Sequence, residues 1–264
     1  MNFRDSVLQV IETENVPSGY KRLGDKVILR SKFDLTEKLG RAVLEVLPWS
    51  TSVFQHLTTT GEVRRPKLKF LAGDRDTLTV HIENGVKYAL DIANITFSGG
   101  NSQLRKRLIT TVHAGEQIVD MFAAVGNLTL QAIKYNNIEA ILVERNEYTY
   151  QFLLKTLKLN NLSDVVTKNQ DSRNLKTLNW ADRVFMGYHA VARDHLASAL
   201  RISKAKSILH LHPLAKNKEY QKTLDIYTSH LEKLGAQIEK VEIQKVKSFA
   251  PGVDHIEITY SIQK

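Results

Sequence analysis

Two apolar runs in the C-terminal half of the chain each carry or end in an acidic residue. The first run, Ile118–Phe122, carries Asp120 and leads into the small-residue turn Ala123–Gly126. A segment with helical spacing follows, and the second run, Ala140–Val143, ends in Glu144. Short continuous apolar runs joined by a helix are typical of parallel strands that are buried on both faces. The pattern therefore predicts a strand–turn–helix–strand unit.

The same alternation of strands and helices continues to the C-terminus. Further strands are predicted over residues 165–171, 181–186, 207–211, 238–246 and 255–262. Helices are predicted around residues 150–157 and over residues 217–234, the latter ended by Gly235. The last two strands are joined through Ala250–Gly252 and form a hairpin. This order predicts an α/β fold of the class I methyltransferase-like (Rossmann-type) kind, a mainly parallel sheet with a C-terminal antiparallel hairpin.

The N-terminal part follows a mixed pattern. Residues 35–47 place apolar side chains at helical spacing, and a short strand is predicted over residues 26–29. Two alternating segments flank Asn84-Gly85, and this dipeptide between such segments predicts a β-hairpin. We therefore predict a smaller α/β N-terminal domain over residues 1–95 and a larger domain over residues 96–264.

The predicted sheet offers a ligand site, because the carboxyl ends of adjacent parallel strands face a shared crevice. Glu144 ends the second strand and can accept hydrogen bonds from a ribose diol, while Asp171 ends the third and can bind an adenine amino group. The turn holds one glycine, Gly126, and lacks the dinucleotide and phosphate-loop motifs. The site therefore suits a nucleoside cofactor without a phosphate cradle, such as S-adenosylmethionine. The alternative is an incidental acid on a core strand, with an Asp171 that caps the next turn.

Two polar side chains precede the first strand of this sheet. Ser98 lies in a Ser-Gly-Gly-Asn loop, and Arg105 belongs to the basic cluster that opens the following helix. A loop hydroxyl and an arginine fork can hold the carboxylate end of an amino-acid cofactor. A flexible hinge with a solvated cationic face is the alternative interpretation.

Aromatic and imidazole side chains lie at the fourth and fifth predicted strands. Tyr188 and His189 can stack on a nucleobase or hydrogen-bond to it, although a core tyrosine and a surface histidine explain them equally well. His210 and His212 alternate onto one face, as a pair of metal ligands would. Because no cluster of further ligands lies near them in the sequence, we predict no metal.

Composition adds a partner to this picture. The 264 residues include 37 Lys and Arg against 28 Asp and Glu, a formal charge of +9 at pH 7, which favours a polyanion such as nucleic acid. The basic segments 64–69 and 204–206 are candidate phosphate contacts, with solvated loops as the alternative. The chain has no cysteine, no signal-peptide pattern and no apolar run of about 18–20 residues. We therefore predict a cytoplasmic protein without a membrane segment, a disulfide or a thiolate metal site.

Several segments together resemble a known group of enzymes. They are Asn84–Tyr88 with Asp91, Phe97-Ser98, Asp120–Gly126, Glu144, Ala181–Val184, and Ala250–Val253 with His255. In order and spacing they are similar to the tRNA position-37 modifying enzymes over about residues 75–264. That group includes the tRNA (guanine-37-N1) methyltransferases and the tRNA wybutosine-synthesising protein 2 family. The methyltransferases end their fourth strand in Asn-Leu-Pro, whereas Met186-Gly187-Tyr188 is similar to the wybutosine branch.

The resemblance implies a function. The wybutosine branch transfers the 3-amino-3-carboxypropyl group of S-adenosylmethionine to a tricyclic guanosine derivative at position 37 of tRNA. Its members do so by in-line attack of a substrate carbon on the γ-carbon next to the sulfonium. The alternatives are methyl transfer to N1 of guanosine and non-catalytic tRNA binding with a degenerate cofactor pocket. The resemblance assigns no general base, and it leaves open the tRNA species, the precursor base and the oligomeric state.

The resemblance also implies roles for single residues. The implied cofactor contacts are Ser98 and Arg105 at the amino-acid side, Glu144 at the ribose, Asp171 and Ser172 at the adenine, and Asp120 on the first strand. Tyr188 and His189 are the candidates for contact with the substrate base. Ala124 stands where the family's turn has its first glycine, and Glu147 stands where the family has proline. These two departures leave open a change in cofactor affinity.

Overall fold

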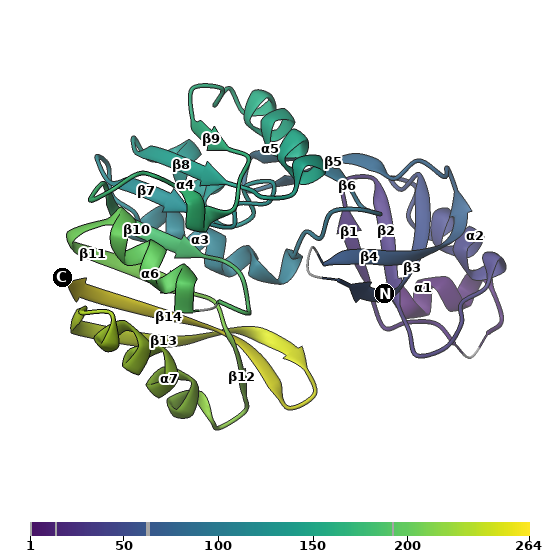
Figure 1. The fold of residues 1–264 in the computed structure, drawn as a ribbon. Helices are drawn as coiled ribbons and strands as arrows, with labels where there is room; N and C mark the ends of the chain where they lie inside the picture. The colour runs from purple at the N-terminus through teal and green to yellow at the C-terminus, as the bar shows by residue number, and fades with distance from the viewer. Residues whose placement is uncertain (1, 14, 62–63, 192) are drawn as a thin grey trace. The chain divides into compact units, whose positions relative to one another are not determined.

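The computed structural model describes residues 2–13, 15–61, 64–191 and 193–264. The chain divides into two compact units, Met1–Gly99 and Gly100–Lys264, and each has its own hydrophobic core (Figure 1). The division falls slightly beyond the boundary at residues 95 and 96 that the sequence suggests. No helix among the described residues is long and apolar enough to cross a membrane.

The N-terminal unit contains a four-stranded sheet, two helices and a separate hairpin. Its elements are α1 (Phe3–Val10), β1 (Tyr20–Leu23), β2 (Lys26–Arg30), α2 (Glu37–Val46), β3 (Ser52–Thr60), β4 (Arg65–Gly73), β5 (Leu78–Glu83) and β6 (Val86–Asp91). The sheet has the order β1-β2-β3-β4, and β2 and β3 are its parallel pair. Val7 of α1, Val43 of α2 and Val53 of β3 share one core, which fixes both helices on the sheet.

Local sequence patterns predict part of this unit correctly. The predicted helix and short strand are confirmed as α2 and β2, and the predicted hairpin is confirmed as β5 and β6. Its turn places Asn84 and Gly85 at φ angles of 49° and 73°, the left-handed pair that a two-residue hairpin requires. The loop interpretation of residues 64–69 is wrong for most of the segment, because Arg65–Gly73 is strand β4, paired with β3. Its positions are mostly exposed or half-buried, so no apolar run marks this strand.

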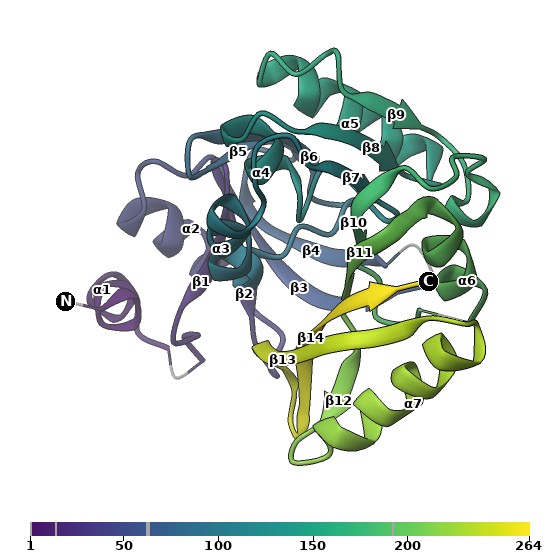
Figure 2. The same ribbon diagram turned by 90° about the vertical axis from the view of Figure 1, so that its left-hand side faces the viewer.

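The C-terminal unit is built on an eight-stranded sheet. Its elements are α3 (Ser102–Thr111), β7 (Gln117–Asp120), α4 (Leu130–Tyr135), β8 (Glu139–Val143), α5 (Glu147–Leu159), β9 (Val166–Lys168), the 3₁₀ turn η2 (Ser172–Asn174), β10 (Ala181–Met186), α6 (Arg193–Ile202), β11 (Ser203–Leu211), β12 (Leu214–Lys216), α7 (Tyr220–Lys233), β13 (Gln237–Ala250) and β14 (Val253–Gln263). A further short 3₁₀ turn, η1 (Gly99–Asn101), precedes α3 at the division between the units. The strand order is β12-β14-β11-β10-β7-β8-β9, with β13 paired to β14. Strands β7 to β11 run parallel, whereas β14 runs antiparallel to β11 (Figure 2).

This arrangement confirms the predicted fold and corrects three of its boundaries. The third strand is shorter than predicted, because the Asp171 side chain accepts the backbone N–H of Arg173 and caps η2. The basic segment 204–206 is not a loop, since β11 begins at Ser203. The predicted helix over residues 217–234 begins only at Tyr220, after the short strand β12 has paired with β14.

The strand order creates a switch point between β7 and β10. From β7 the chain adds β8 and β9 on one side, and it then returns to add β10 on the other side. In open α/β sheets, a ligand-binding crevice forms at such a switch point, at the carboxyl edge of the strands. The predicted ligand residues Glu144, Asp171 and Tyr188 all follow strands that end at this edge.

Candidate active site

The registers of the parallel strands place four chain segments level at the carboxyl edge. Asp120 of β7 pairs with Leu142 of β8 and Phe185 of β10. Phe185 in turn pairs with His210 of β11. Just beyond the ends of these strands, two residues further along, the chain continues as Phe122, Glu144, Gly187 and His212. These residues follow strands on both sides of the switch point, where sheets of this kind bind ligands.

Asp120 supports the turn that follows β7. It is fully buried, and its carboxylate accepts the backbone N–H of Phe122 at 3.1 Å and the Thr129 hydroxyl at 2.9 Å. Burial, with a smaller effect from the nearby charge of Glu144, raises the pKa of Asp120 to about 6 against the opposing effect of these two hydrogen bonds. Asp120 therefore holds the turn after β7 in place. Its predicted contact with the cofactor stays a prediction.

Glu144 joins two turns at the crevice. Its carboxylate accepts the backbone N–H of Ala124 at 3.0 Å and that of Asn146 at 2.7 Å. Burial raises the pKa of Glu144, and these backbone hydrogen bonds act in the opposite direction. Each carboxylate oxygen keeps a second lone pair, so the group can still accept hydrogen bonds from a ribose diol. The geometry thus fits the role predicted for Glu144.

Ala124 adopts a backbone conformation that favours glycine. Its φ angle is +49°, in the left-handed region, which costs an alanine about 1–2 kcal/mol. The chain nevertheless forms the turn, and the Ala124 N–H points to Glu144. The departure from the family pattern at this position therefore strains the turn without removing its hydrogen bond.

Arg105 is a completely buried cation beside this turn. It lies on α3 with no exposed surface, and its Nη1 donates to the carbonyl oxygen of Asn127 at 3.1 Å. A buried guanidinium close to the crevice turn is suited to an anionic group such as a carboxylate. Ser98 belongs to the N-terminal unit, so its predicted contact with the same group stays a prediction.

Asp171 is held by a neighbouring arginine. Nε and Nη2 of Arg173 lie 2.9 Å and 2.7 Å from its two carboxylate oxygens. This arginine lowers the pKa of Asp171 to about 2, against the opposing effect of burial, so the carboxylate stays ionised. Ser172 is buried and opens η2. Asn169 ties this loop to β8, because its Nδ2 donates to the carbonyl oxygen of Glu144 at 2.8 Å.

An aromatic group lies where the chain leaves β7 and β10. The half-buried ring of Tyr188 stacks on Phe122, with centroids 5.3 Å apart and an interplanar angle of 24°. His195 of α6 contacts the same Phe122 ring at 5.2 Å. A Cβ at Gly187 would lie 2.8 Å from Cδ1 of Leu128, so glycine permits the close approach of β10 to the crevice turn. Stacked aromatic side chains at a crevice suit a planar nucleobase.

The predicted histidine pair is buried, and His210 is part of a polar network. Its Nε2 lies 2.8 Å from Nη1 of Arg183, which can only donate, so this nitrogen accepts. Its Nδ1 then donates to Glu257 at 2.9 Å, and burial lowers the pKa of His210, so the ring is neutral. Among the residues that the structure describes, no group of three or more His, Asp or Glu side chains is arranged to hold a metal ion.

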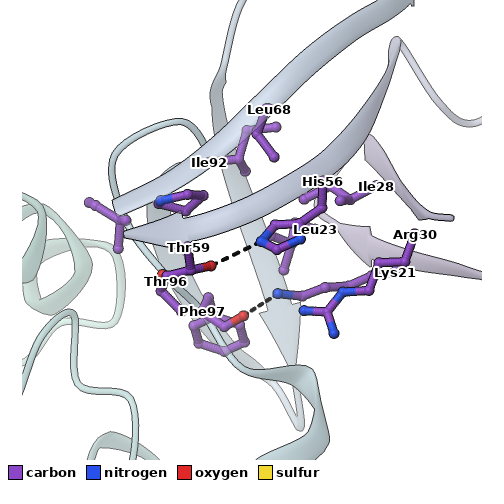
Figure 3. A pocket seen from close by; sticks show the side chains of 12 residues that line it. Lys21, Leu23, Ile28, Arg30, His56, Thr59, Leu68, Ile92, Thr96 and Phe97 are labelled. Carbon is purple, nitrogen blue, oxygen red and sulfur yellow. Dashed lines mark hydrogen bonds between the residues drawn. The ribbon is translucent and has the colours of Figure 1, made fainter. Parts of the chain in front are cut away.

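The N-terminal unit has a pocket of its own, which Figure 3 shows. His56 Nε2 lies 2.9 Å from the Thr59 hydroxyl, and Lys21 Nζ donates to the carbonyl oxygen of Phe97. Burial lowers the pKa of His56, and the charges of Arg30 and Lys21 lower it further. The pocket therefore combines two cations with a neutral imidazole, and it is suited to an anionic or hydrogen-bonding group.

Sequence reasoning missed three residues that shape the crevice. Phe122 was part of a predicted strand and carried no chemical signal, although an aromatic residue directly after a crevice strand is a candidate stacking platform. Asn169 contacts Glu144, and His255 contacts His212, through hydrogen bonds between residues far apart in the sequence. A single sequence carries no signal for such long-range partners.

The fold and the crevice define a class I methyltransferase-like protein with a nucleoside-type ligand site. The TRM5/TYW2 methyltransferase domain matches residues 79–243, and the TYW2 N-terminal domain matches residues 5–77. The chain therefore belongs to the TRM5/TYW2 family, as the sequence motifs predict.

Named relatives place the chain within this family more closely. The chain is 33% identical to the tRNA(Phe) (4-demethylwyosine(37)-C(7)) aminocarboxypropyltransferase of Pyrococcus horikoshii, over 94% of this chain and 91% of the relative. The structure of P. horikoshii TYW2 in complex with MeSAdo matches with a TM-score of 0.86 at 31% identity, over 99% and 98% of the two chains. That of M. jannaschii TYW2 in complex with AdoMet matches with a TM-score of 0.75 at 27% identity, over 93% and 100%. Archaeal relatives named tRNA (guanine(37)-N(1))-methyltransferase show lower identities of 26% and 28%.

Proposed function

We propose that this protein transfers the 3-amino-3-carboxypropyl group of S-adenosylmethionine to a tricyclic guanosine derivative at position 37 of tRNA. The observation that carries the proposal is the row of strand ends in the C-terminal unit. Glu144 follows β8 and is proposed to hold the nucleoside, and the stacked rings of Phe122 and Tyr188, which follow β7 and β10, are proposed to receive the nucleobase. Family membership and the name of the P. horikoshii relative support the same reaction.

S-adenosylmethionine fits the residues of the crevice. Glu144 would hold the ribose, and Asp171 with Ser172 would hold the adenine. Arg105 is a buried cation for the carboxylate of the methionine part, and Ser98 is proposed to assist it. The AdoMet complex of the M. jannaschii relative supports this choice of cofactor. When bound, the cofactor supplies a sulfonium leaving group, so the protein's task is to orient two reactants and exclude water.

The aromatic side of the crevice is proposed to receive the acceptor base. Phe122 and Tyr188 give a planar base a stacking surface, and the end of β10 carries Met186-Gly187-Tyr188 in place of Asn-Leu-Pro. The acceptor carbon attacks the γ-carbon in line with the bond between the γ-carbon and sulfur. Because the three carbons on the sulfonium are chemically similar, the choice of the transferred group follows from which carbon faces the acceptor.

The basic charge of the chain supports tRNA as the macromolecular partner. A formal charge of +9 favours association with a polyanion. We propose that the N-terminal unit contributes to this contact, because Lys21 and Arg30 line its pocket (Figure 3). A cytoplasmic location follows as a further proposal from the activity on tRNA.

Mass spectrometry of nucleosides tests the proposal. The protein is incubated with S-adenosylmethionine and tRNA that carries the tricyclic precursor, with unmodified tRNA in parallel. The expected result is a gain of about 101 Da on the precursor, the mass of an aminocarboxypropyl group that replaces hydrogen. A gain of about 14 Da on unmodified guanosine would assign methyl transfer instead.

The family also contains methyltransferases, so methyl transfer to N1 of guanosine is the second candidate. It is favoured less, because the residues at the end of β10 differ from those of that branch. A degenerate cofactor pocket is disfavoured by the turn itself. Ala124 keeps the left-handed conformation and its hydrogen bond to Glu144, so the crevice turn is formed.

A further inference from the structure

His189 has a ring orientation that a carbonyl group fixes. Its Nδ1 lies 2.8 Å from the carbonyl oxygen of His212. A carbonyl oxygen can only accept a hydrogen bond, so Nδ1 carries the proton and Nε2 is the basic nitrogen of the neutral ring. An imidazole whose tautomer is set by a second group is the arrangement that general-base histidines use.

Two buried histidines pack behind this ring. The rings of His189 and His255 meet edge to face at 4.7 Å, and Nδ1 of His212 lies 3.2 Å from Nε2 of His255. His212 and His255 are 1% and 2% exposed. Burial, together with the neighbouring imidazoles, lowers the pKa of His212 to about 4 and that of His255 to about 2. At neutral pH both rings are uncharged and put no positive charge against a protonated His189.

The charged groups around these histidines come from α3, β13 and β14, and Arg107 of α3 pairs with Glu257. Glu257 is buried, and its Oε1 lies 3.8 Å from Nε2 of His212, which places a negative charge behind the ring cluster. Lys247 pairs in register with His255 and donates to the side chain of Asn101 at 2.8 Å. The carboxylate favours a proton on the cluster, and the lysine opposes one.

The position of His189 places it on the acceptor side of the crevice. Glu144 and Asp171 follow β8 and β9, and β7 and β10 are the next strands in the sheet, so a nucleoside held by these carboxylates would extend its reacting carbon toward β7 and β10. His189 follows Tyr188 directly after β10, and its partners come from the end of β11 and from β14. The half-buried His189 ring consequently stands at the edge that the acceptor base must approach.

We propose that His189 is the general base of the transfer, an inference that rests on the proposed function. The acceptor carbon forms a bond to the γ-carbon while the bond between the γ-carbon and sulfur breaks. Sulfur keeps the electron pair of the broken bond and becomes a neutral thioether. The acceptor ring then holds a positive charge and the hydrogen of the attacked carbon. Nε2 of His189 takes this hydrogen as a proton, the C–H electrons restore the aromatic ring, and the proton later passes to water.

Three variants of the full chain test this inference. In His189→Gln the side chain can still bond to the His212 carbonyl but cannot accept the proton. We expect its kcat to fall on the order of 10²–10⁴-fold, with tRNA affinity and the KM for S-adenosylmethionine within about threefold of the parent. His189→Ala should lose a similar factor and recover activity when imidazole is added, with a pH dependence that follows imidazole. His113→Gln, an exposed histidine before β7, is the matched control and should keep full activity.

The outcomes separate this inference from the proposed function. A parent protein that is active beside an equally active His189→Gln variant overturns the general base alone. Failure of imidazole to restore His189→Ala, with cofactor and tRNA binding intact, overturns it as well, because a merely structural ring would not respond to added base. A parent protein that forms no aminocarboxypropyl nucleoside overturns the proposed function and this inference with it.

Discussion

The two flanks of the crevice in the C-terminal unit are built from different chemistry. On the flank of β8 and β9, Glu144 and Asp171 are carboxylates that backbone N–H groups and Arg173 hold in place. On the flank of β10, β11 and β14, Tyr188 stacks on Phe122, and His189 packs on His255, one of two buried histidines behind it. The first flank offers fixed negative charge, which suits the hydrogen-bond donors of ribose and adenine. The second offers neutral rings, which suit a planar base and a proton in transit.

We expect the largest effect, a loss of stability, from removing the buried negative charge of Glu257. Glu257 accepts from His210 and pairs with Arg107, so Glu257→Gln leaves Arg107 without its counter-charge. We expect a loss of about 3–5 kcal/mol in the free energy of unfolding at pH 7, measured by urea denaturation. Glu239→Gln, at an exposed glutamate, is the control. A loss below about 1 kcal/mol would contradict the role of this carboxylate in holding the ring flank.

The same carboxylate makes stability depend on pH. Burial alone would raise the pKa of Glu257, but the hydrogen bond from His210 and nearby positive charge lower it to about 2 from the ordinary 4.5. A lowered folded pKa stabilises the fold above pH 4.5, and this contribution is lost as the pH falls toward 2. The Glu257→Gln variant should therefore show a flatter stability profile between these pH values than the parent does.

On the carboxylate flank, Glu144→Gln should weaken cofactor binding most. The variant removes the charge that accepts the ribose hydroxyls and turns an amide N–H₂ toward one of two backbone N–H groups. We expect the Kd for S-adenosylmethionine to rise about 10–100-fold by titration calorimetry, equivalent to about 1.5–3 kcal/mol for a charged hydrogen bond. Glu139→Gln, exposed at the start of the same strand, should leave the Kd unchanged. Equal Kd values for both variants would remove Glu144 from the site.

A smaller effect is expected for Asp171→Asn. Arg173 already engages both carboxylate oxygens of Asp171, so the side chain contributes less free charge to a bound adenine than Glu144 contributes to a ribose. We expect the Kd for S-adenosylmethionine to rise about 2–10-fold, the range of a neutral hydrogen bond. A loss as large as that of Glu144→Gln would show that Arg173 releases Asp171 when the cofactor binds.

The smallest effect is expected at the strained turn between the flanks. Ala124→Gly relieves the left-handed strain at φ +49° but adds chain entropy to the unfolded state. The net gain in the free energy of unfolding should be about 0.5–1 kcal/mol, with cofactor affinity at least equal to the parent. Ala123→Gly, at the buried neighbouring position, should destabilise the fold instead. Destabilisation by Ala124→Gly would mean that the methyl group packs usefully in the turn.

The sequence predicts those features that local chemistry determines. The Asn84-Gly85 hairpin and the strand that ends before Glu144 follow from turn preference and from short apolar runs. Residues 165–171 look extended in the sequence, which predicts a strand up to Asp171. In the structure the strand ends at Lys168, and the Asp171 side chain accepts the backbone N–H of Arg173 and caps η2. The contacts among the side chains of the ring flank depend on the register between strands that are far apart in the sequence. A single sequence gives no signal for this register. The meeting of His189 with His255 therefore had no signal in the sequence.

The identity of the released thioether tests the central claim most directly. The protein, S-adenosylmethionine and precursor tRNA are mixed for a single turnover, and the adenosine products are separated by chromatography. We propose that the γ-carbon faces the ring flank, and we therefore expect methylthioadenosine in a one-to-one ratio with aminocarboxypropylated tRNA. Release of S-adenosylhomocysteine in that ratio with methylated tRNA would contradict it.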